Sequence, residues 1–171
     1  MNNIEIEVLV RSKKWFDYLD QFKINDDISN ICQDLFKEEP LKDLVKSFKI
    51  AALQFSLTNN RQIKEINQQS CGKNKATNIL SFPNFSNKEL VDQIDKKTNY
   101  ILLGDIIISC EKVAQESRKQ NKKFKNHLTH LILHGILHLF NFDHQNDDEA
   151  EIMENIEIKI LKNLNINNPY N

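Results

Sequence analysis

Three histidines stand close together in the segment HGILHLFNFDH: His134, His138 and His144. The i, i+4 spacing of the first two places both imidazoles on one face of a helix, so two ring nitrogens can reach one point. His144 can supply a third nitrogen if the chain reverses after Phe140. Asn141 suits such a reversal because asparagine tolerates a left-handed backbone conformation. The pattern therefore predicts a metal site of three histidines that holds about one zinc ion per chain.

The same ligand offsets occur in the metzincin zinc peptidases, whose pattern is H-E-x-x-H-x-x-G-x-x-H. Gly135 stands where those enzymes have the glutamate that acts as general base, so the sequence argues against a peptidase. A glycine inside a helix costs about 1 kcal/mol relative to alanine. This cost indicates a structural reason for Gly135. It either forms the floor of a substrate cleft or allows tight packing against a strand.

Three neutral imidazoles leave the double positive charge of a bound metal uncompensated, unlike a site that includes a carboxylate or thiolate. Such a centre favours anionic substrates. It also polarises a phosphoryl oxygen and lowers the pKa of a bound water towards about 7. Phosphodiester cleavage is therefore chemically reasonable without the missing glutamate.

The helix that must carry this site is predicted over residues 124–140. His127 and His130 fall on the same stripe as the two ligand histidines, within about 80° of one another around the helix. Apolar residues occupy most of the remaining circumference, which predicts a buried central helix. His127 lies two turns from His134 and has no spacing reason to reach the metal. His130 is predicted to bond either the substrate or a backbone carbonyl.

The rest of the chain predicts an α/β fold, in one domain spanning residues 1–171, with a small mixed sheet of about four strands and about five helices. SNKELVDQIDKKTN, residues 86–99, is either a mobile flap or a short helix. The acidic run at 147–157 is predicted to be a solvated helix face. The predicted strands are 4–10, 48–57, 77–82 and 100–109, and the predicted helices are 26–36 with capping aspartates, 59–69, 110–120, 124–140 and 147–163.

Composition limits the partners. The formal net charge of -1 argues against a chain that coats nucleic acid or membrane by bulk electrostatics. RKQNKKFK, residues 118–125, holds five cations and is the best candidate for an RNA or ribosome surface, unless it is only a solubilising helix end. The three cysteines are far apart in sequence and indicate reduced thiols, and no segment approaches the length of a membrane span. We expect a cytoplasmic protein with no membrane partner.

Three stretches resemble the YbeY family of bacterial rRNA-maturation factors and single-strand-specific metallo-endoribonucleases. They are HLTHLILHGILHLFNFDH, ATNILSFP and LGDIIIS, and the likeness spans residues 50–165. The resemblance implies that His134, His138 and His144 bind zinc. It further implies trimming of the 3′ end of small-subunit (16S) rRNA and a part in ribosome quality control, with rRNA precursor, the small ribosomal subunit and assembly proteins as partners.

The chain departs from that family at Cys71. When the segment INQQSCGKNKATNILSFP is aligned with the family pattern, Cys71 stands where the family has an arginine. The resemblance implies that this arginine is functional. A thiol cannot hold a phosphate with two parallel bonds as a guanidinium does. Lys73 and Lys75 could contact substrate and replace part of the charge, or residues 71–75 form a plain solvated loop. The absence of this arginine favours an alternative function. In this alternative the protein is a largely non-catalytic ribosome-assembly factor with a structural zinc site.

Four further polar residues are candidates for supporting roles. Asp143, next to His144, either acts as a base or fixes the turn. Asp105 either orients a zinc-ligand imidazole or is paired locally with the backbone or a lysine. Ser109 is predicted as the N-cap of the helix that follows it. The amide of Asn78 could hold a loop or a ligand histidine.

Overall fold

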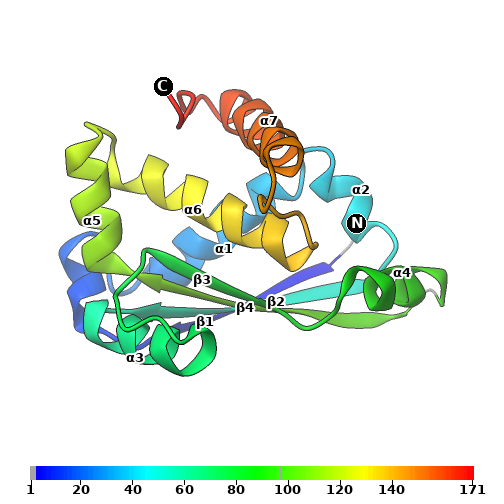
Figure 1. Ribbon diagram of the computed structural model, residues 1–171, viewed down its shortest axis with the longest axis horizontal. Helices are drawn as coiled ribbons and strands as arrows, with labels where there is room; N and C mark the ends of the chain where they lie inside the picture. The colour runs from blue at the N-terminus through cyan, green and yellow to red at the C-terminus, as the bar shows by residue number, and fades with distance from the viewer. Residues whose placement is uncertain (1–2, 97) are drawn as a thin grey trace.

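The computed structural model describes residues 3–96 and 98–171, and its centre is a four-stranded sheet (Figure 1). The strands lie in the order β1-β2-β4-β3. β1, β2 and β4 run parallel, and β3 pairs antiparallel with β4 at the edge. The predicted α/β class and mixed sheet are therefore confirmed. The strand bounds are Asn3–Val10 for β1, Ile50–Thr58 for β2, Ile79–Pro83 for β3 and Tyr100–Ser109 for β4.

Seven α-helices lie within the described residues, where five were expected. The additional two are α2 and α4, and α4 shows that a short helix, the second alternative for the segment 86–99, forms over Asn87–Asp95. Ser86 and Glu89 form a reciprocal capping box at its start. The helices are α1 Ile24–Leu35, α2 Leu41–Val45, α3 Asn60–Cys71, α4 Asn87–Asp95, α5 Cys110–Lys119, α6 Phe124–Leu139 and α7 Asp147–Asn163, and a 3₁₀ helix spans Lys13–Asp17.

The start of α1 differs from the prediction. The helix begins at Ile24, so Asp26 and Asp27 lie inside its first turn instead of capping it. Acidic side chains are favourable there because the helix dipole is positive at that end. No helix in residues 3–96 and 98–171 is long and apolar enough to cross a membrane.

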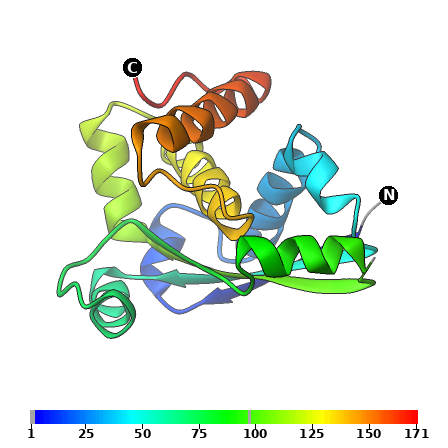
Figure 2. The same ribbon diagram turned by 45° about the vertical axis from the view of Figure 1, so that its right-hand side comes forward.

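One face of the sheet carries α6, which packs against β3 and β4, and α7 crosses above α6 (Figures 1 and 2). α3 lies on the opposite side of the sheet. Leu128, Leu133 and Ile136 of α6 are fully buried in the hydrophobic core. The prediction of a central buried helix is confirmed, and this position fixes the direction in which its histidine stripe points.

Gly135 is the point of closest approach between α6 and the sheet. A Cβ atom at this position would lie 2.9 Å from Ile79 Cδ1 and 3.1 Å from both Ile106 Cδ1 and Ser81 Oγ. These distances are shorter than ordinary van der Waals contact. Gly135 therefore serves the packing of α6 on β3 and β4, and its interpretation as a cleft floor was wrong.

Candidate metal centre

The structure brings the three predicted ligands together. His134 and His138 project from α6, and His144 returns towards them from the following loop. One ring nitrogen of each lies within 4.8 Å of the others. The Nε2 atoms of His134 and His138 are 3.1 Å apart. Three imidazoles on two adjoining segments thus face one point, as the sequence spacing predicted.

The reversal after α6 takes place at Asn141, as predicted. Its φ angle is 62°, in the left-handed region. The amide of Asn141 donates to the carbonyl of His138 (2.9 Å), and the amide of Phe142 donates to that of Leu137 (3.0 Å), a pattern that closes the last helical turn. The side-chain amide of Asn141 also donates to the carbonyl of Phe85 (3.0 Å). These bonds direct the next residues back towards the ligand pair.

The electrostatics of the cluster suit metal binding. Burial lowers the pKa of His138 to about 4, and the neighbouring His134 and His144 act in the same direction. His138 is therefore neutral at neutral pH, as a metal ligand must be. Three imidazole nitrogens suit zinc, whose structural sites usually have four protein ligands and whose catalytic sites have three. Within the residues that the structure covers, no fourth such side chain joins the group.

The cluster opens into a cleft of about 880 Å³. The residues around β3 form one wall, and the loop after α6 and the first turns of α7 form the other. Gly135 is not among the lining residues. The lining includes Thr77–Ser81, Pro83, Asn87, His134, His138, Asn141–Gln145, Glu149 and Ile152.

A buried carboxylate behind His134 was missed from the sequence. Glu157 of α7 is fully buried, although the acidic run that contains it was predicted to be solvated. Burial would raise its pKa, but hydrogen bonds from His130 and His134 lower the pKa to about 2. The signal in the sequence is the helical spacing of Met153, Glu157, Ile160 and Leu161, all buried, which places Glu157 on the apolar face of α7.

The other two histidines of α6 bind carboxylates. His130 Nε2 lies 3.0 Å from Glu157 Oε2, so this nitrogen bonds a carboxylate and not the predicted backbone carbonyl, and contact of His130 with substrate stays a prediction. His127 Nε2 lies 2.9 Å from Glu116 Oε2, outside the metal cluster as expected. Asn78 Nδ2 donates to the same Glu116 oxygen (3.0 Å). Asn78 thus holds a carboxylate of α5, and not a ligand histidine.

Asp105 does not support the metal site. Strand register places Asp105 beside Gln54, which is beside Glu7, while the next residue, Ile106, faces Gly135 of α6. Because successive side chains of a strand alternate, Asp105 points away from the histidines. Burial raises its pKa, and the charge of Glu7 adds to that effect. The prediction that it orients a zinc ligand was therefore wrong.

Ser109 and Asp143 occupy the predicted places. Ser109 is the N-cap of α5, but its hydroxyl donates to Asn60 Oδ1 (2.8 Å) and makes no capping bond. Asp143 lines the cleft. Its carboxylate accepts hydrogen bonds from the backbone amide of His144 (2.8 Å) and the side-chain amide of Gln145 (2.6 Å). The bond from His144 lowers the pKa of Asp143. Asp143 therefore fixes the turn, one of its two predicted roles, and its role as a base stays a prediction.

Cys71, Lys73 and Lys75 lie at the end of α3 and on the loop that leads to β3. All three are exposed. The cleft lining begins only at Thr77, beyond them along the chain. The structure therefore does not bring these residues into the cleft wall, and their contact with substrate stays a prediction.

The cations of the 118–125 run differ in their surroundings. Lys119 lines a groove of about 530 Å³ that shares Asn78, Ile79 and His134 with the metal cleft. Lys122 Nζ donates to the carbonyl of Pro169 (2.6 Å), and Lys125 forms an ion pair with Asp27 (3.2 Å). Lys119 therefore lines a groove that adjoins the metal cleft, whereas Lys122 and Lys125 are bonded elsewhere.

Comparison with known proteins gives a consistent result. The family described as Endoribonuclease YbeY matches residues 9–165. The endoribonuclease YbeY of Bartonella henselae is 38% identical over 168 residues, which cover 98% of this chain and 97% of that protein. The solution structure of TM1509 from Thermotoga maritima has a TM-score of 0.55 at 21% identity, covering 94% of this chain and 91% of that one. That likeness shows a shared fold.

Proposed function

Because this chain belongs to the endoribonuclease YbeY family, we propose that it is a zinc-dependent hydrolase that cuts single-stranded RNA. In this proposal residues 1–171 work as one domain in the cytoplasm. The cellular role is maturation of the 3′ end of small-subunit rRNA and ribosome quality control, with the small subunit and assembly proteins as partners.

The observation that carries this proposal is the convergence of three imidazoles in an open cleft. When bound there, zinc supplies Lewis acidity towards a phosphoryl oxygen and towards water. His134, His138 and His144 hold the ion without adding negative charge, which suits a polyanionic substrate.

The other cleft residues suit an unpaired strand. Phe142 offers a ring on which a base can stack, and Ile79 and Ile152 offer apolar surface. Ser81 and Asn87 provide groups that can bond a ribose hydroxyl or phosphate. Single-stranded RNA can present its bases and its backbone to these side chains at once, whereas bases in a duplex are stacked inside the helix.

The test uses nuclease-free, zinc-loaded protein with a labelled single-stranded RNA and with the same RNA annealed to its complement. We expect cleavage of the single strand, loss of cleavage on chelation and recovery when zinc is returned. The His138→Ala protein, purified in the same way, should be inactive. Equal cleavage by this variant would assign the activity to a contaminant and contradict the proposal.

The alternative is a ribosome-assembly factor with a structural zinc ion, favoured by Cys71 in place of an arginine. Against it, structural zinc sites are closed by four protein ligands, whereas three side chains form the group in the described part of this chain. Zinc-loaded protein that binds RNA or the small subunit and never cleaves would favour the alternative.

A further inference from the structure

Glu157 differs from every other acid of the 147–157 run. Asp147, Asp148, Glu149, Glu151 and Glu154 are exposed on α7, whereas Glu157 faces α6 with no exposed surface. A buried carboxylate is unfavourable unless hydrogen bonds satisfy its oxygens. Hydrogen-bond donors between α6 and α7 must therefore compensate for the burial of Glu157.

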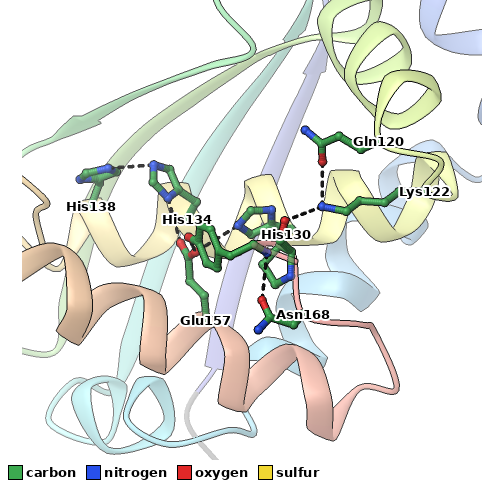
Figure 3. Close-up of polar contacts among 9 residues, drawn as sticks. Gln120, Lys122, His130, His134, His138, Glu157 and Asn168 are labelled. Carbon is green, nitrogen blue, oxygen red and sulfur yellow. Dashed lines mark hydrogen bonds and ion pairs between the residues drawn. The ribbon is translucent and has the colours of Figure 1, made fainter.

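Both carboxylate oxygens are used, and two of the three partners are histidines of α6. Oε1 lies 2.8 Å from His134 Nδ1, and Oε2 lies 3.0 Å from His130 Nε2. Figure 3 shows Glu157 reaching from α7 to this pair, while His138 lies on the far side of His134. The hydroxyl of Tyr170 donates to Oε2 as well.

The bond to His134 determines which of its nitrogens is free. An ionised carboxylate only accepts, so Nδ1 of His134 must carry a hydrogen, and in a ring with a single hydrogen Nε2 keeps its lone pair. Nε2 is the atom 3.1 Å from His138 Nε2, on the side of the ligand cluster. Glu157 thus holds His134 in the tautomer and ring orientation that a metal ligand needs.

The C-terminal segment supports this arrangement from the other side. Tyr170 packs edge-on against His130, with ring centres 5.7 Å apart. The carbonyl of Pro169 accepts from Lys122 Nζ (2.6 Å), and the amide of Tyr170 donates to Asn168 Oδ1 (2.9 Å). The end of the chain is therefore fastened across α6, where it holds the second oxygen of Glu157.

We propose that Glu157 is a positioning residue for the metal centre, which fixes His134 through Nδ1, and that Tyr170 steadies Glu157 in turn. This inference rests on the metal site of the proposed function, but not on RNA cleavage. Replacing the carboxylate partner of a ligand histidine commonly weakens metal binding by about 10- to 100-fold.

The first experiment compares Glu157→Gln with Glu151→Gln, which removes the same charge from an exposed position of the same helix. Zinc affinity is measured by competition with a chromophoric chelator, and coordination by the visible absorption spectrum of the cobalt-substituted protein. We expect Glu157→Gln to bind zinc about 10- to 100-fold more weakly and to alter the cobalt spectrum. Glu151→Gln should match the unchanged protein, and Tyr170→Phe should weaken binding by less than Glu157→Gln.

A second measurement needs no metal and covers the case of a poorly folded variant. Nitrogen-15 shifts of the imidazoles in the metal-free, unchanged protein should show His134 with its hydrogen on Nδ1. A hydrogen on Nε2, or unchanged zinc affinity and cobalt spectrum in folded Glu157→Gln, would overturn the inference. Tight zinc binding without RNA cleavage would contradict the proposed function and leave the role of Glu157 standing.

Discussion

The three candidate ligands are held in different ways. His134 is fixed by Glu157, and His138 is half-buried on the same helix. His144 is exposed and lies on a loop, where its backbone amide is bonded to Asp143. The position of His144 therefore depends on the turn after α6, whereas His134 and His138 are carried by the helix itself.

Zinc content should follow these three side chains. We expect about one zinc per chain in the purified protein and a sharp decrease in His134→Ala, His138→Ala and His144→Ala, measured by atomic emission after gel filtration. His127→Ala is the matched control from the same helix stripe, because His127 bonds Glu116 instead. Full zinc occupancy in all three ligand variants would contradict the assignment of these histidines as the zinc ligands.

Cys71 offers a gain-of-function test. Cys71→Arg should raise turnover on single-stranded RNA, because a guanidinium can hold a phosphate with two charge-assisted bonds. One such group commonly contributes about 3 kcal/mol to transition-state stabilisation, roughly a hundredfold in rate. The gain should be smaller here than that limit, because Cys71 lies outside the cleft lining.

Two companion variants separate charge from geometry at this loop. Cys71→Lys adds the charge without the planar fork and should give a smaller gain than Cys71→Arg. Lys73→Ala should lower turnover if Lys73 replaces part of the missing charge. Rates are compared at equal zinc loading and ionic strength. If none of the three changes cleavage or RNA affinity, the loop does not contact substrate.

Among the elements, the end of α6 decides where His144 lies. Asn141→Val should destabilise the protein by about 1–2 kcal/mol, because a branched side chain is strained at positive φ. It should also lower zinc affinity by displacing the loop. Asn141→Gly keeps the turn and should change zinc affinity little, though it loses the bond to Phe85. Chemical denaturation and chelator competition measure both effects, and equal behaviour of the two variants would show that the turn does not need a left-handed residue.

Local patterns predicted most of these elements. β4 and α7 begin and end at the predicted residues, and the asparagine turn follows from the conformational preference of one residue. Glu157 was included in a solvated acidic run, and orienting a zinc ligand was one of two roles left open for Asp105. Which carboxylate reaches the histidines depends on how α7 crosses α6 and on which face of the sheet α6 covers. The charge of Glu157 suggested a solvated position, although its helical spacing placed it with apolar residues.

In the whole molecule, charge is separated by position. Glu7 and Asp105 lie beside Gln54 on the face of the sheet away from α6, and the exposed acids of α7 line its first turns. Both regions repel a polyanion. Arg118 and Lys119 lie instead in the last turn of α5, and the groove lined by Lys119 adjoins the metal cleft. We therefore expect RNA to enter the cleft from the α5 side.

This path predicts how RNA affinity depends on salt and on single lysines. Each phosphate contact to a single strand contributes a slope of about 0.7 to the fall of log affinity with log salt concentration. Lys119→Gln should weaken binding and reduce the slope by about that amount. Lys125→Gln removes the same charge from the same basic run, but Lys125 is already paired with Asp27, so its effect should be smaller. Binding measured by fluorescence anisotropy from low to physiological salt tests both, using His138→Ala protein to prevent cleavage. An affinity independent of salt, or equal effects of the two variants, would place the RNA on another surface.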